Sequence, residues 1–228
     1  MAAFAAPAFC EDGHKLKQMT AACGLQNVLV APSFFKIELP RKSIVISSKA
    51  PDWKIVTANT RSKLFCETPL SQFKANYIAS ATQMQLTDLA LMQEIPAQKR
   101  ASKFGAYQCI DFAVRQVDDS FNSFEGARST TYRVLDDAKM PAAAGKVLKR
   151  LCGFTSIMSN KIPLSMEVIS QQGMRSRFLI TTEVIPAHDV KADVLSSKYK
   201  LVAKEIDVFR DPQMQEDIRD MLDANEHK

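Results

Sequence analysis

Apolar and polar residues alternate along much of the chain with a period of two, the pattern of a β-strand with one buried face. The clearest example runs from Ile162 to Val184, where two such runs meet at Gln171-Gln172-Gly173. A short polar break that contains glycine, set between apolar runs, indicates a β-hairpin. The residues that alternation assigns to a common face in the two arms are Leu164, Met166 and Val168, then Phe178, Ile180 and Val184.

Residues 26–68 repeat this pattern in shorter units. Apolar runs are separated by turn residues at intervals of about ten residues, which predicts an antiparallel meander. The predicted strands are Val28–Val30, Phe34–Leu39, Ile44–Ser48, Trp53–Ala58 and Lys63–Thr68. Three further strands are predicted at Lys103–Val117, Ser129–Leu135 and Tyr199–Phe209, in addition to the hairpin.

Helical spacing is confined to short segments. The best example is Pro141–Leu151, which begins with proline, continues with alanines and places Val147, Leu148 and Leu151 on one side. One or two helical turns are predicted in Glu11–Cys23, where Leu16 and Met19 are three residues apart. Two more helices are expected at Thr87–Glu94 and from Pro212 to the C-terminus.

The order of elements predicts an α+β protein whose sheet is a curved, incomplete antiparallel β-barrel of about 9–11 strands with covering helices. The expected organisation is an N-terminal segment at 1–25 and a single domain at 26–209, with a helical insertion at 71–96. A C-terminal helix follows at 210–228. One domain is favoured over two because the late strands need partners from the early ones.

The composition is that of an ordinary globular protein, with 46% hydrophobic and 24% charged residues among 228. The formal net charge is +5, but the 30 basic residues are scattered among 25 acidic ones. Without a Lys/Arg run, nucleic acid is not expected as a partner. No stretch approaches the roughly 18 apolar residues that span a bilayer.

The N-terminus leaves two alternatives open. Ala6-Pro7-Ala8 resembles the end of a secretory signal peptide, although the charged and long apolar regions of such a peptide are missing. A frayed terminus explains the same residues. The five cysteines likewise allow a Cys10–Cys23 disulfide in an oxidising compartment, or five reduced thiols with Cys66, Cys109 and Cys152 in the core.

Catalytic signatures are absent from the sequence. The three histidines, His14, His188 and His227, are far apart, and Cys109 has no local signature of a nucleophile. No glycine-rich phosphate loop, zinc-binding helix or serine nucleophile motif occurs. The chain is therefore predicted not to be an enzyme and to require no cofactor and no metal.

What remains is a large amount of apolar strand surface and few helices to cover it. One hypothesis is a curved sheet that encloses an apolar cavity, with Phe73–Ile95 as its lid. The other is a filled core, since apolar strand faces are usually core. The residues predicted to line the cavity are Phe35, Ile37, Ile44, Ile46, Trp53, Ile55, Leu64, Met166, Val168, Phe178 and Ile180.

The order NVLVAPSFFKIELP, SIVISS, PDWKIVTAN, SKLFCET, FGAYQCIDF, YRVLDDAKMP and KIPLSMEVISQQGMRSRFLITTEVIP resembles the bacterial outer-membrane lipoprotein carrier family. The resemblance covers residues 26–209 and concerns pattern and order, with no signature motif. It implies an incomplete antiparallel barrel closed by helices, whose apolar interior accepts acyl chains. The chain departs from the family in having no intact signal peptide or lipobox cysteine.

These observations predict non-catalytic binding or carriage of a hydrophobic or lipidated ligand in the cell envelope. The expected partner is an acylated ligand or a lipoprotein, with a membrane-associated protein left open. The expected location is periplasmic or secreted, with the cytoplasm as the alternative. The competing prediction is a protein-interaction module with the same sheet and a filled core.

Overall fold

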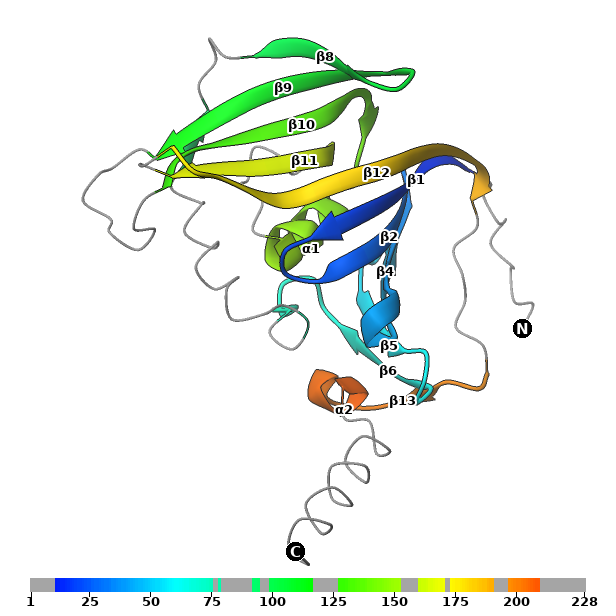
Figure 1. Ribbon diagram of the computed structural model, residues 1–228. Coiled ribbons are helices and arrows are strands. Elements are labelled where there is room, and N and C mark those ends of the chain that lie inside the picture. The colour runs from blue at the N-terminus through cyan, green and yellow to red at the C-terminus, as the bar shows by residue number, and fades with distance from the viewer. Residues whose placement is uncertain are drawn as a thin grey trace, which may run out of the picture.

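The structure is a computed structural model that describes residues 11–75, 78, 92–94, 99–116, 127–152, 160–170, 173–190 and 197–209. These residues form one open sheet, antiparallel except at one edge, and two short α-helices (Figure 1). The predicted α+β class is confirmed. The described part of the sheet has 13 strands, more than the 9–11 predicted. The run predicted at Lys103–Val117 divides into two strands, and two segments predicted as helical, Glu11–Cys23 and Thr87–Glu94, contain further strands.

The first half of the chain is a continuous meander, as the spacing of turn residues predicts. Its strands are β1 (Glu11–Thr20), β2 (Gly24–Ala31), β3 (Phe34–Leu39), β4 (Ile44–Lys49), β5 (Ile55–Asn59) and β6 (Leu64–Thr68), with a 3₁₀ turn at Pro40–Lys42 between β3 and β4. Each strand pairs antiparallel with the next. Trp53 precedes β5 in a turn rather than in the strand, with a positive φ of 51°.

The second half builds the other wing of the sheet and then returns to the edge of the first wing, beside β6. Its elements are β7 (Met92–Glu94), β8 (Arg100–Phe104), β9 (Tyr107–Gln116), β10 (Ala127–Lys139), α1 (Ala142–Cys152), β11 (Lys161–Ser170), β12 (Arg175–Val190), β13 (Lys200–Leu201) and α2 (Glu205–Phe209). The predicted hairpin is confirmed as β11 and β12, and Gly173 in its turn has a φ of +81° that favours glycine.

The two wings meet where β1 pairs with β12, in the middle of the strand order β13-β6-β5-β4-β3-β2-β1-β12-β11-β10-β9-β7. The prediction of helical turns at Glu11–Cys23 is therefore wrong. Leu16, Gln18 and Thr20 are buried at a period of two, while Met19 is 42% exposed. The buried polar residues concealed this strand from a hydrophobic pattern.

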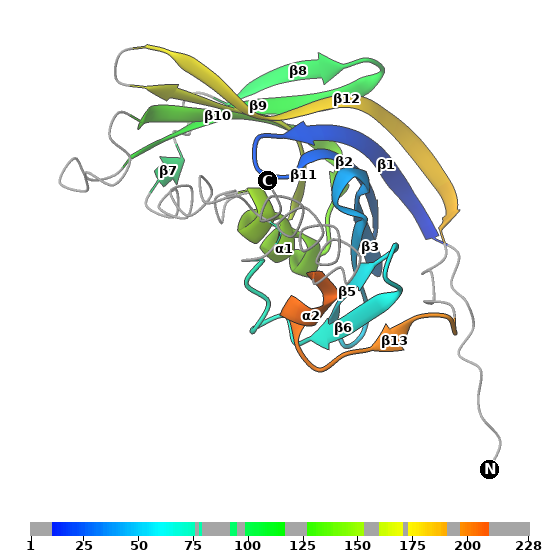
Figure 2. The same cartoon turned by 60° about the horizontal axis from the view of Figure 1, so that its bottom comes forward.

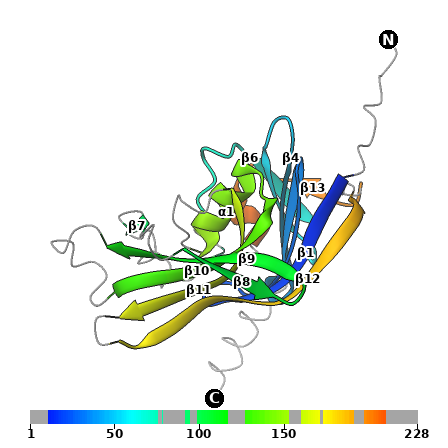
Figure 3. The same cartoon turned by 90° about the horizontal axis from the view of Figure 1, so that it is seen from above.

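Both wings curve toward the same side, and α1 lies on that concave side (Figures 2 and 3). The core cluster joins residues of both wings to Val147, Leu148 and Leu151 of α1. The predicted helix at Pro141–Leu151 is thus confirmed, with its apolar side directed at the sheet. We call the two sides of the sheet the concave face, which contacts α1, and the outer face.

Two further predictions are wrong. The closing strand at Tyr199–Phe209 is a two-residue strand, β13, parallel to β6, followed by α2. Glu205 and Asp207 lie in the first turn of α2, where carboxylates favour a helix N-terminus. Within the predicted helix Thr87–Glu94, residues 92–94 form strand β7, which pairs with β9; the rest of that segment lies outside the described residues.

Among the described residues, Cys23, Cys66 and Cys109 are free, buried thiols. Burial raises the pKa of all three, so none has the stabilised thiolate of a reactive cysteine. Cys10 and the predicted C-terminal helix lie outside the described residues.

Candidate functional site

Most of the predicted cavity residues meet on the concave face. Seven of them are buried in one cluster with α1, and Trp53 and Phe178 pack against that cluster. The seven are Phe35, Ile37, Ile44, Ile46, Ile55, Met166 and Val168. Leu64 is half-buried in β6, and Ile180 is 37% exposed on the outer face. On β12 the core side holds Leu179 and Thr181 instead, both at most 5% exposed.

Two helices, α1 and α2, and one short segment lie over this apolar face, and Val208 of α2 is fully buried in the same cluster. We call α1 together with residues 70–75 and 78 the cover. The Arg150 side chain of α1 donates hydrogen bonds to the backbone carbonyls of Leu70, at 2.6 Å, and of Phe73. Lys42 donates to the carbonyl of Ile78 from the sheet side. Arg150 thus joins the two parts of the cover, and Lys42 joins the cover to the turn between β3 and β4.

The side chains by which the cover contacts the sheet are apolar. Ala143, Ala144, Val147, Leu148 and Leu151 of α1 are all buried, and Phe73 and Ile78 are fully buried beside them. These side chains contribute apolar burial, which is not directional.

A chain of polar side chains crosses the floor of the concave face at the junction of the two wings. The Nε2 atom of Gln18 donates to the Pro163 carbonyl at 2.8 Å and to Thr181 Oγ1 at 3.0 Å. The Nε2 atom of Gln26 donates to Gln18 Oε1 at 2.8 Å. Gln18, Gln26 and Thr181 are buried, so these bonds form away from water.

The direction of these hydrogen bonds follows from their first acceptor, the Pro163 carbonyl. The Pro163 carbonyl can only accept, so Gln18 must direct its amide nitrogen to it and its oxygen to Gln26. Gln26 must then donate its own nitrogen to Gln18. Within the described residues, Gln26 Oε1 has no hydrogen-bond partner and ends the chain.

Because of this direction, the two glutamines contribute unequally to the stability of the fold. We expect Gln18→Leu to destabilise the fold more than Gln26→Leu, because it leaves the Pro163 carbonyl and the Gln26 amide unpaired. Each buried group left unpaired costs about 1–3 kcal/mol. Gln26→Leu leaves only Gln18 Oε1 unpaired and removes an acceptor that was already unpaired. Urea unfolding of both variants measures the difference. An equal or larger loss for Gln26→Leu would contradict the assigned direction.

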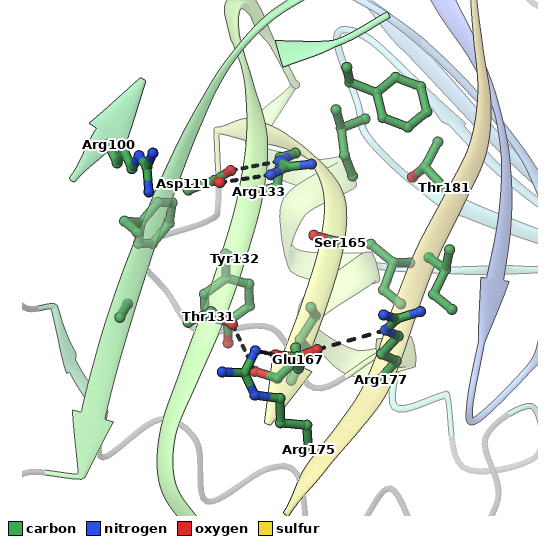
Figure 4. A pocket seen from close by; sticks show the side chains of 17 residues that line it. Arg100, Asp111, Thr131, Tyr132, Arg133, Ser165, Glu167, Arg175, Arg177 and Thr181 are labelled. Carbon is green, nitrogen blue, oxygen red and sulfur yellow. Dashed lines mark hydrogen bonds and ion pairs between the residues drawn. The ribbon is translucent and has the colours of Figure 1, made fainter. Parts of the chain in front are cut away.

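A groove of about 560 Å³ lies on the outer face, across strands β8 to β12 (Figure 4). Alternation places its polar side chains opposite the core residues of the same strands. Thr131 and Arg133 flank the buried Tyr132, and Ser165 and Glu167 flank the buried Met166. We call this hollow the outer groove.

Ion pairs in the outer groove are of two kinds. Arg133 and Asp111 form a two-pronged pair, with Nε–Oδ1 at 2.7 Å and Nη2–Oδ2 at 2.8 Å, and Ser102 donates to the same carboxylate at 2.7 Å. The Arg133 hydrogen bonds lower the pKa of Asp111, against burial, which raises it. Arg175 and Arg177 share Glu167 through longer contacts of 3.4 and 3.7 Å.

A second outer-face hollow, of about 440 Å³, lies over β1, β2 and β3 and the adjoining part of β12. Its charged lining residues are Lys15, Lys17, Lys36, Glu38 and Glu183. The two outer hollows were missed by sequence reasoning, which followed the apolar positions. The signal that could have found the outer groove is the alternation of Arg175 and Arg177 in the second arm of the hairpin.

The described residues hold no cluster of three or more His, Cys, Asp or Glu side chains placed to bind a metal ion. In the same residues, no helix has the length and apolar character needed to cross a membrane. His14 is half-buried, and burial lowers its pKa. Its ring packs edge-on against that of Tyr107, with the ring centroids 6.0 Å apart.

No known protein family and no curated protein matches the chain. Among solved structures, an uncharacterised conserved protein from Thermus thermophilus shares 8% sequence identity. The match covers 83% of this chain and 89% of that one, with a TM-score of 0.39. A similarity this low supports no conclusion about function.

Proposed function

We propose that the chain binds a hydrophobic or lipidated ligand, without catalysis, between the concave face of the sheet and the cover. In this proposal the sheet acts as an incomplete barrel, as in the lipoprotein carrier family that the sequence resembles. The observation that carries the proposal is the gathering of seven predicted lining residues in one cluster on the concave face, together with buried side chains of α1 and with Val208 of α2.

The energetics permit exchange of the cover for a ligand. Fully burying an aliphatic side chain is worth about 1.5–3 kcal/mol, so lifting Val147, Leu148 and Leu151 off the sheet costs about 5–9 kcal/mol by that measure. An acyl chain of about 14 methylenes gains about 11 kcal/mol when it is buried, at about 0.8 kcal/mol for each methylene. The gain exceeds the cost of exposing these three side chains, to which the buried Ala143 and Ala144 of α1 add.

A filled-core interaction module is the second candidate, and one observation favours it. Phe35, Ile37, Ile46 and Ile55 are all 0% exposed. Side chains packed in this way need no ligand to exclude water. Under this alternative the cover stays in place and the outer face makes the functional contacts.

Titration with a fluorescent fatty acid separates the two candidates. The carrier proposal predicts saturable binding with one probe per chain and blue-shifted emission, and competition by an unlabelled acyl chain. Substituting Ile46 by Asp places a charge under the cover and is expected to abolish this binding, while circular dichroism monitors folding. The control, Val45→Asp, changes the neighbouring, half-buried position of β4. Absence of saturable binding by the unmodified protein would favour the filled core.

A further inference from the structure

The outer groove carries an excess of guanidinium groups. Its charged lining residues are four arginines, Arg100, Arg133, Arg175 and Arg177, and two carboxylates, Asp111 and Glu167. A hollow lined by one predominant sign of charge concentrates the field and attracts ions of the opposite sign.

The two arginines on β12 form only weak ion pairs with Glu167. Their contacts with Glu167 are longer than the roughly 2.7–2.9 Å of a strong charge-assisted hydrogen bond. Both side chains are 70% exposed. Exposed ion pairs of this kind contribute little, about 0–1 kcal/mol. Arg175 and Arg177 can therefore turn toward a ligand at little cost, while Asp111 holds Arg133 in a fixed orientation.

The arrangement fits a phosphate group better than a carboxylate. Arg175 and Arg177 are two residues apart on one strand, hence about 7 Å apart along its axis, and both point over the groove in Figure 4. A phosphate offers more oxygens than a carboxylate for two guanidinium forks to share. The hydroxyl of Ser165 lies in the same lining and adds a neutral donor, whereas that of Thr131 donates to the Glu167 carbonyl at 3.4 Å.

The groove also has room and an apolar wall for the organic part of such a ligand. Its volume of about 560 Å³ exceeds what one phosphate group fills. Ile180 lines it and is 37% exposed, and Met19, its register partner on β1, is 42% exposed. A bare inorganic ion leaves these side chains unused, whereas an ester contacts them.

We propose that the outer groove binds a phosphate ester through Arg175 and Arg177, with Arg133 as a fixed third cation. Two sources share this chemistry, the headgroup of an anionic phospholipid and a soluble phosphate ester. The site lies on the opposite face of the sheet from the proposed acyl site, so it stands independently of the carrier function.

The test compares the double variant Arg175→Gln/Arg177→Gln with a control of equal charge, Lys54→Gln/Lys198→Gln. Lys54 is on the far wing, paired with Glu67 at 3.5 Å, and Lys198 is exposed. One arm measures sedimentation with vesicles of phosphatidylcholine containing phosphatidylglycerol, against phosphatidylcholine alone. The other arm measures calorimetric titration with glycerol 3-phosphate.

The unmodified protein and the control are expected to bind in at least one arm, and the groove variant about tenfold or more weakly in that arm. Binding confined to vesicles identifies a lipid headgroup, and binding of glycerol phosphate identifies a soluble ester. Equal weakening of both variants would reduce the effect to net charge and overturn the proposal, as would no binding in either arm. Fatty-acid uptake by the groove variant is expected to be unchanged, which separates this result from the carrier proposal.

Discussion

Truncation of Ile46 to alanine is expected to lower the free energy of unfolding by about 2–5 kcal/mol, the range for removing a large aliphatic side chain from a packed core. Ile46 lies on β4 beneath the cover and is 0% exposed. Its register partners are Ile37 and Thr57, both fully buried, so surrounding side chains cannot collapse freely into the space. Urea unfolding followed by circular dichroism measures the loss.

The same variant also tests the acyl site. Truncation enlarges the space beneath the cover, so a fatty acid is expected to raise the midpoint of thermal unfolding more for Ile46→Ala than for the unmodified protein. The matched control is Val45→Ala, at the half-buried neighbouring position, where a smaller loss of stability is expected. Equal losses at positions 45 and 46 would contradict the assignment of the two faces.

Replacement of Arg150 by methionine is expected to loosen the cover. Methionine keeps an unbranched stem but removes the donors to the Leu70 and Phe73 carbonyls. Leaving part-buried carbonyls without their charged donor costs about 1–3 kcal/mol. The expected results are faster hydrogen exchange in the amides of α1 and faster uptake of a fluorescent fatty acid.

Lys146→Met is the matched control, because Lys146 belongs to the same helix and is exposed. It removes one positive charge and leaves the contacts between α1 and residues 70–73 intact. If Arg150→Met leaves both the exchange of α1 and the rate of uptake at the level of this control, the cover does not open through this contact.

The meander and the hairpin were predictable because their signals are local. β4 alternates strictly, β3 does so from Phe35 onward, and Gly173 marks the turn of the hairpin. β1 was not predictable in this way. Gln18 is buried there because Pro163 and Thr181, distant in sequence, accept its hydrogen bonds, whereas Thr20 is bonded locally to Gly24 and Cys23. Hydrophobic patterning does not register a buried glutamine.

The same physical reason explains why Ile180 of β12 was wrongly predicted to face the core. Leu179 and Thr181 occupy the core side, since Thr181 accepts a hydrogen bond from Gln18, and an irregularity in register lies between Lys17 and Gln18. Ile180 consequently lies in the outer groove. The groove itself depends on strands β8 to β12 being brought side by side, with register partners such as Asp111 and Arg133 at distant positions in sequence.

The most direct test of the acyl-binding proposal is native mass spectrometry of the protein purified from its own host, before and after organic extraction. The proposal predicts an additional mass in the range of an acyl chain or lipid, which extraction removes and an added fatty acid restores. A clean mass of the chain alone, together with no uptake of the fatty acid, would contradict it and leave the filled core as the correct description.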